Sequence, residues 1–134
     1  RTEAGLAVVV AHEVAHALAR HGAERMSDQM VASVGTAAAA VALSATVTGR
    51  SRTYLPAMMA ALGAGATVGY LLPMSRAQES EADRIGLVLM ALAGYDPREA
   101  VSLWERMRAA GTGQRQAEWL STHPSDGTRI SDIR

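Results

Sequence analysis

The first predicted helix is apolar around almost its whole circumference between Leu6 and Arg20. At about 100° per residue, the exceptions His12, Glu13, His16 and Arg20 fall within a single arc. A helix that is apolar nearly all round is typical of a protein core rather than of a surface. The pattern therefore predicts a buried helix, and its one polar arc is a candidate functional site.

The end of this helix is expected between His21 and Met26, where Gly22 is a weak stop signal. If the helix continues that far, His21 lies about 180° around it from His12 and cannot bind the same metal ion. We therefore interpret His21 as a structural residue.

Two uncharged runs follow, from Gln29 to Gly49 and from Thr53 to Ser75. Each is long enough to cross a bilayer, but both are rich in small residues, and Pro56 interrupts the second. We expect residues 29–75 to form an apolar helical hairpin inserted into the domain. Two placements stay open: we favour a hairpin packed near the active site, and the alternative is a hairpin that is inserted in a membrane or faces one.

A further helix is predicted over Ser75–Tyr95, ended by Gly94. Glu79, Asp83 and Gly86 share one face of it, because their spacing follows the i, i+3, i+4 rule. Glu79 and Asp83 can supply a metal ligand and a partner for the other ring nitrogen of a ligating histidine. Gly86 would let two helices approach closely.

Two alternatives stay open on this helix. Glu81 is a competing ligand, although it lies about 160° from Asp83 and beside Arg84 on the side expected to face solvent. Arg76, Glu79 and Asp83 can also be read as an exposed, salt-bridged stripe.

The remainder of the chain is expected to be mostly helical. Asp96 and Pro97 open a helix that ends near Gly111. A short helix over 114–120, a loop over 121–125 that carries His123, and a final capped helix follow. In the helix that Asp96 and Pro97 open, the core face is expected to consist of Ala100, Leu103, Trp104 and Met107.

The H-E-x-x-H spacing of residues 12–16 carries the candidate chemistry. Two imidazoles at i and i+4 point the same way and can hold one zinc ion, with Glu13 placed as a general base beside them. The longer metzincin pattern is absent, because Ala19 and Gly22 stand where it needs glycine and a third histidine. A third ligand must therefore come from elsewhere in the chain.

The composition of the chain limits the number of domains, the types of metal ligand and the class of partner that can be expected. The chain has 134 residues, enough for a single domain with a core, and it contains no cysteine, so any zinc ligands are histidines and carboxylates. Thirteen basic residues balance thirteen acidic ones, so nothing favours a nucleic acid as partner. The candidate active-site helix begins within the first few residues, and we expect the chain to be a fragment that lacks upstream strands.

Four segments resemble one known family: HEVAH at 12–16, SRAQESEADRIG at 75–86, AGYDP at 93–97 and LSTHPSDGTRI at 120–130. They are similar to the gluzincin metallopeptidases of the HtpX, BepA and CAAX prenyl endopeptidase family, and the closing segment looks most like the BepA branch. The resemblance implies a mainly α, helical zincin catalytic core over residues 1–134. It also implies that Glu79 is the third zinc ligand, beside His12 and His16, with Asp83 next to the site.

The resemblance implies a function as well. We expect a one-zinc endopeptidase that cleaves internal bonds of unfolded or misassembled proteins in the bacterial cell envelope, for quality control. Glu13 would be the general base, with His123, Arg76 and Arg129 as candidates to stabilise the oxyanion; His123 could instead occupy the open metal position and hold the enzyme latent. The alternative function is a membrane-associated helical binding or chaperone module whose zinc is structural or absent.

Overall fold

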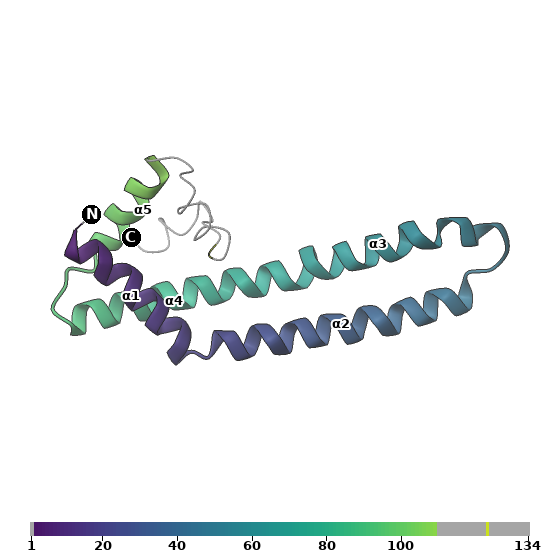
Figure 1. The fold of residues 1–134 in the computed structure, drawn as a ribbon, viewed down its shortest axis with the longest axis horizontal. Coiled ribbons are helices and arrows are strands. Elements are labelled where there is room, and N and C mark those ends of the chain that lie inside the picture. Colours follow the sequence, from purple (N-terminus) through teal and green to yellow (C-terminus); the bar gives the residue numbers. More distant parts are fainter. Residues whose placement is uncertain (1, 110–122, 124–134) are drawn as a thin grey trace. The chain divides into compact units, whose positions relative to one another are not determined.

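The computed structural model describes residues 2–109 and His123, and these residues are almost entirely helical (Figure 1). No strand occurs among them, which confirms the mainly α prediction. The predicted helix over 114–120, the loop around His123 and the final helix lie outside the described residues. The elements are α1 (Glu3–Leu18), α2 (His21–Thr46), the 3-10 helix η1 (Gly49–Tyr54), α3 (Leu55–Ala66), the π-helical turn η2 (Thr67–Leu71), α4 (Leu72–Leu92) and α5 (Glu99–Ala109).

The chain divides into two compact units. The first comprises residues 1–21 and 76–134, and the second comprises residues 22–75. The sequence-based hairpin over 29–75 falls inside the second unit, while its description as an insertion into a single catalytic domain stays a prediction.

In the first unit, α1 crosses the C-terminal part of α4 (Figure 1). A Cβ built on Gly86 of α4 would lie 3.3 Å from the backbone nitrogen of His12, so the two helices approach closely because glycine has no side chain. The core at this crossing contains Val8, Ala11, Met90 and Ala100. Side chains of α5 complete it, since Trp104 is buried and Leu103 packs against the cluster.

One side of α1 is exposed, contrary to the prediction of a helix buried all round. Gly5, Val8, Ala11, His12 and Ala15 make up the buried side. By contrast, the exposed fractions of Leu6, Val10, Val14 and Leu18 are 63%, 51%, 42% and 63%. The prediction was wrong because apolar composition does not itself supply a packing partner for every face: α4 and α5 cover one side of α1 only.

The predicted end of the first helix was also wrong. The helix ends at Leu18, and Arg20 adopts a left-handed conformation with φ of 59°. This turn separates α1 from α2, which begins at His21. The predicted stop at Gly94 is confirmed: α4 ends at Leu92 and Gly94 has φ of 82°.

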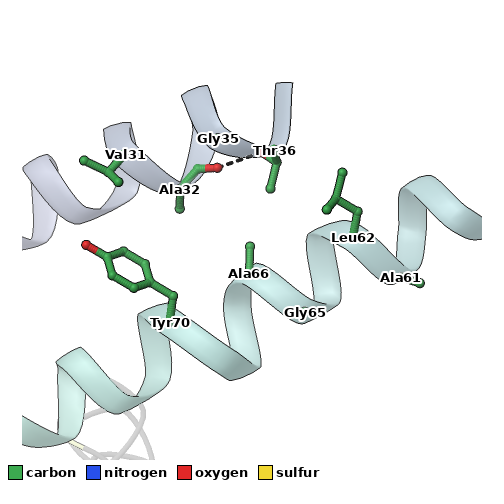
Figure 2. Close-up of a pocket in the computed structure, with 9 residues that line it drawn as sticks. All are labelled: Val31, Ala32, Gly35, Thr36, Ala61, Leu62, Gly65, Ala66 and Tyr70. Carbon is green, nitrogen blue, oxygen red and sulfur yellow. Dashed lines mark hydrogen bonds between the residues drawn. The ribbon is translucent and has the colours of Figure 1, made fainter. Parts of the chain in front are cut away.

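The second unit is a helical hairpin in which α3 returns alongside α2 after η1 (Figure 1). Tyr70 donates a hydrogen bond of 2.9 Å to Asp28 and links its two arms. Between the arms lies an apolar groove of about 450 Å³ (Figure 2). Its lining is formed by Val31, Ala32, Gly35, Thr36, Ala61, Leu62, Gly65, Ala66 and Tyr70.

Two helical stretches, His21–Thr46 and Gly49–Leu92, are long and apolar enough to cross a membrane. In each stretch, no residue of the most apolar 18-residue window is buried inside the protein. Length and composition therefore permit membrane contact.

Candidate metal centre

Four predicted site residues come together in the first unit. His12 and His16 lie on α1, Glu79 lies on α4, and His123 lies far along the chain. One ligand atom from each of the four lies within 4.8 Å of all the others. Because His12 and Glu79 are nearly fully buried, this is a polar cluster inside the unit rather than an exposed salt-bridged stripe.

The distances among three of these residues fit a tetrahedral metal ion. The Nε2 atoms of His12 and His16 are 3.1 Å apart, and the Glu79 carboxylate lies 3.3 Å from the first and 3.5 Å from the second. Tetrahedral zinc ligands at about 2.0–2.2 Å from the metal are separated by roughly 3.3–3.6 Å. Two imidazoles and a carboxylate are also a ligand set that zinc accepts, so the residues present fit the ion.

The other ring nitrogen of His12 faces a carboxylate. Its Nδ1 atom lies 3.0 Å from Oδ1 of Asp83, one helical turn beyond Glu79 on α4. A carboxylate at this ion-pair distance can fix the orientation of a ligating imidazole and raise its basicity. The structure therefore places Asp83 beside His12 and outside the group of four.

Glu13 lies at the open side of the cluster. Its side chain is 49% exposed, and Oε1 lies 3.5 Å from Nε2 of His123. The His123 ring centre is 5.3 Å from the ring centres of both His12 and His16. A carboxylate and an imidazole thus border the cluster on the side of Glu13.

Burial lowers the pKa of His16 from 6.5 to about 4. This net pKa includes an opposing contribution from the Glu79 carboxylate and smaller lowering contributions from the rings of His12, His21 and His123. His16 is therefore neutral near pH 7, which is the form that binds a metal ion.

His21 approaches the cluster, which sequence reasoning missed. Its Nδ1 lies 2.8 Å from Nδ1 of His16, and its Nε2 lies 3.4 Å from Oε2 of Glu81. The approach depends on the left-handed Arg20, which ends α1 before His21. No glycine marks that position, so the only available signal was the histidine itself.

The remaining candidates lie outside this group of four. Arg76 is exposed on α4, and the side chain of Glu81 is 60% exposed. Arg129 lies outside the described residues.

The family model described as peptidase family M48 matches residues 1–134. The mitochondrial metalloendopeptidase OMA1 of Schizosaccharomyces pombe is 42% identical over 98% of this chain and 36% of its own length. OMA1 of Saccharomyces cerevisiae is 37% identical over 96% of this chain and 35% of its own length. The beta-barrel assembly-enhancing protease of Escherichia coli is 32% identical over 98% of this chain and 27% of its own length. No solved structure matches the chain.

These findings correct one expectation and limit another. Relatives from two yeasts and from Arabidopsis thaliana are named as mitochondrial enzymes, so the expectation of a bacterial cell envelope was wrong. The family's sequence motifs do not record the compartment, which is why they misled. The chain also spans only a quarter to about a third of the length of these relatives, at 36%, 35% and 24%.

Proposed function

Because this chain belongs to peptidase family M48, we propose that it carries the catalytic centre of a zinc-dependent endopeptidase. Membership in the family confirms the resemblance read from the four sequence segments. The named relatives are metalloendopeptidases and a protease, which supports hydrolysis of peptide bonds inside protein substrates.

The observation that carries the proposal is the convergence of His12, His16 and Glu79. Both imidazoles turn Nε2 toward the carboxylate, and the three groups are spaced as tetrahedral ligands would be. In our proposal these three residues hold one zinc ion. Asp83 orients His12 through its Nδ1 atom.

Zinc bound at this site would supply Lewis-acid polarisation of a water molecule and of the scissile carbonyl. Glu13 is the general base: its exposed carboxylate takes a proton from the attacking water and passes it to the leaving amine. Glu13 is well placed for this, because it belongs to the same helix as both histidines but is not one of the clustered ligands.

His123 has two proposed roles that remain distinct. It can donate a hydrogen bond to the developing oxyanion, or it can occupy the open metal position reversibly and keep the enzyme latent. Its contact with Glu13 and its place in the cluster support either role. Arg76 and Arg129 stay weaker candidates for oxyanion stabilisation, since Arg76 is exposed and Arg129 lies outside the described residues.

Unfolded or misassembled proteins are the proposed substrates. One relative is named a beta-barrel assembly-enhancing protease, and this name links a protease of the family to the assembly of other proteins.

A second candidate function is a membrane-associated binding or chaperone module. The observation that favours it is that no residue in the most apolar window of either candidate spanning helix is buried; Val34 and Val41, for example, are 64% and 69% exposed. Lipid contact through residues 29–75 is compatible with the peptidase as well, so the two functions differ in chemistry rather than in location.

Proteolysis of a denatured protein by the full-length enzyme separates the two functions. The peptidase proposal expects cleavage that a chelator blocks and added zinc restores. Cleavage that persists in the chelator, or no cleavage at any zinc concentration, would contradict it and favour the binding module.

A further inference from the structure

We propose that His21 is a positioning residue of the metal centre, which fixes the His16 imidazole and links it to the carboxylate of Glu81. The inference rests on the proposed function, because it concerns how a proposed metal ligand is held. It assigns a role to a buried imidazole that the catalytic mechanism does not use.

The contact between the two rings is close and directional. The two Nδ1 atoms are 2.8 Å apart, and the rings meet edge to face, with centres 4.8 Å apart at 74°. At this distance one nitrogen must carry the proton and the other must offer its lone pair.

The metal-facing side of His16 decides which nitrogen is the donor. Nε2 of His16 points into the cluster, 3.1 Å from Nε2 of His12 and 3.5 Å from Glu79. A nitrogen that binds a metal ion carries no proton, so the neutral His16 ring keeps its proton on Nδ1. His16 therefore donates and His21 accepts.

The hydrogen bond from His16 also determines where the proton lies on His21. A neutral His21 that accepts at Nδ1 carries its own proton on Nε2, and this atom lies 3.4 Å from Oε2 of Glu81. The side chain of His21 is 1% exposed, whereas that of Glu81 is 60% exposed. His21 thus connects a buried ligand to a carboxylate at the surface of the unit.

The fold brings His21 to this place through the turn before it. Arg20, with φ of 59°, interrupts the helix between α1 and α2, so His21 begins a new helix. A continued helix would have put His21 on the opposite side from His12. A buried imidazole without partners is unfavourable, and here both ring nitrogens face polar atoms.

The two ligating histidines are therefore held by different partners. Asp83 contacts Nδ1 of His12 directly, while His16 reaches a carboxylate only through His21. A neutral acceptor orients an imidazole but increases its basicity less than a carboxylate does. His16 is consequently expected to be the less basic of the two ligands.

Competition titrations of zinc against a chelator, on the full-length protein, test this role. Replacing the imidazole by an apolar side chain in His21→Leu removes the acceptor, and zinc affinity should fall about 10- to 100-fold, the usual effect of losing an outer partner. His21→Asn places Oδ1 near the position of Nδ1, so it should recover most of that loss. An unchanged affinity in His21→Leu, or an equal loss in both variants, would overturn the proposal.

Nitrogen-15 spectra of the zinc-loaded wild-type protein provide a second test that needs no folded variant. With labelled histidine, we expect a proton on Nδ1 of His16, none on Nδ1 of His21 and one on Nε2 of His21. A proton on Nδ1 of His21 would refute the proposed direction of the hydrogen bond.

His16→Ala distinguishes failure of this inference from failure of the proposed function. If His16→Ala binds zinc as tightly as wild type, the ligand set is wrong and the inference falls with it. If His16→Ala loses zinc while His21→Leu keeps it, the ligand set stands and only the role of His21 is refuted.

Discussion

At the scale of single residues, three carboxylates on α4 have different proposed roles. Glu79 is proposed as a ligand and Asp83 as the residue that orients His12, whereas Glu81 lies outside the cluster. Glu79→Ala should therefore lose zinc under conditions in which Asp83→Ala, reduced about 10- to 100-fold in affinity, still binds some. Zinc content after dialysis measures this.

Glu81→Ala is the matched control for the ligand assignment. It removes an acidic side chain from the same helix, two residues from either of the others, and should keep zinc far better than Glu79→Ala. If Glu81→Ala were instead the variant that emptied the site, the ligand assignment would be wrong by about half a turn of α4.

The depressed pKa of His16 gives a pH dependence for the metal-free protein. Its pKa is about 4 in the folded protein against 6.5 for the free side chain, so between these values the unfolded chain binds more protons than the folded one. The free energy of unfolding should consequently decrease as the pH falls from about 6.5 toward 4.

Urea denaturation of chelator-treated protein at pH 7 and pH 5 measures this effect. His16→Gln, which cannot titrate, should show a smaller decrease than wild type over the same interval. Equal decreases in the two proteins would show that His16 is not the group responsible.

At the scale of elements, the crossing of α1 and α4 determines where the ligands lie. A side chain at Gly86 would meet the backbone of His12 at 3.3 Å, and backbone cannot move aside as a flexible side chain can. Gly86→Val should therefore cost about 1–3 kcal/mol of stability, the usual cost of overpacking, and should weaken zinc binding by shifting α1.

Gly63→Ala is the control for that prediction. A Cβ at Gly63 of α3 meets nothing within 4 Å, so the substitution should leave stability unchanged or raise it by about 0.5–1 kcal/mol through helix propensity. Thermal unfolding of both variants compares them. A Gly86 variant as stable as Gly63→Ala would show that the crossing is looser than described.

Helical periodicity explains why much of the centre could be predicted. His12 and His16 share a face because any α-helix puts i and i+4 together, and the same rule groups Glu79, Asp83 and Gly86. Contacts between distant segments and unusual backbone conformations do not follow from helical periodicity. The residue type of Arg20 does not indicate its left-handed conformation. The helix was therefore predicted to continue, which placed His21 on the side opposite His12.

The burial of α1 could not be predicted from local sequence either. Leu6 and Val10 were predicted to be buried from their composition, but burial depends on partners elsewhere in the chain, which a local pattern does not contain. The meeting of His123 with Glu13 is likewise a tertiary contact between distant segments. The dipeptide His123–Pro124 indicated an extended backbone there, and the family resemblance, rather than spacing, placed it near the site.

At the scale of the whole molecule, the exposed apolar side chains of the hairpin now favour the second of its two placements, in which residues 29–75 contact lipid. Detergent-phase partition of the full-length protein measures this. Replacing Val34 and Val41 of α2 by aspartate should reduce partition, because each is an exposed apolar side chain of the hairpin. Leu6→Asp, which changes an equally exposed residue of α1, should leave partition unchanged.

Two results would contradict lipid contact by the hairpin. One is a protein that stays fully soluble without detergent. The other is ready cleavage by trypsin at the exposed Arg50 and Arg52 in the presence of vesicles. Both would favour the other placement predicted from the sequence, a hairpin packed near the active site.

The rate of peptide-bond hydrolysis by zinc-loaded Glu13→Gln is the sharpest test of the proposed zinc endopeptidase centre, in which Glu13 is the general base. Glu13 lies beside the clustered ligands without being one of them, so this variant should bind one zinc ion as wild type does. Its turnover of a denatured protein should fall about 100-fold or more, the usual effect of removing a general base. Undiminished turnover by the zinc-loaded variant would contradict the account.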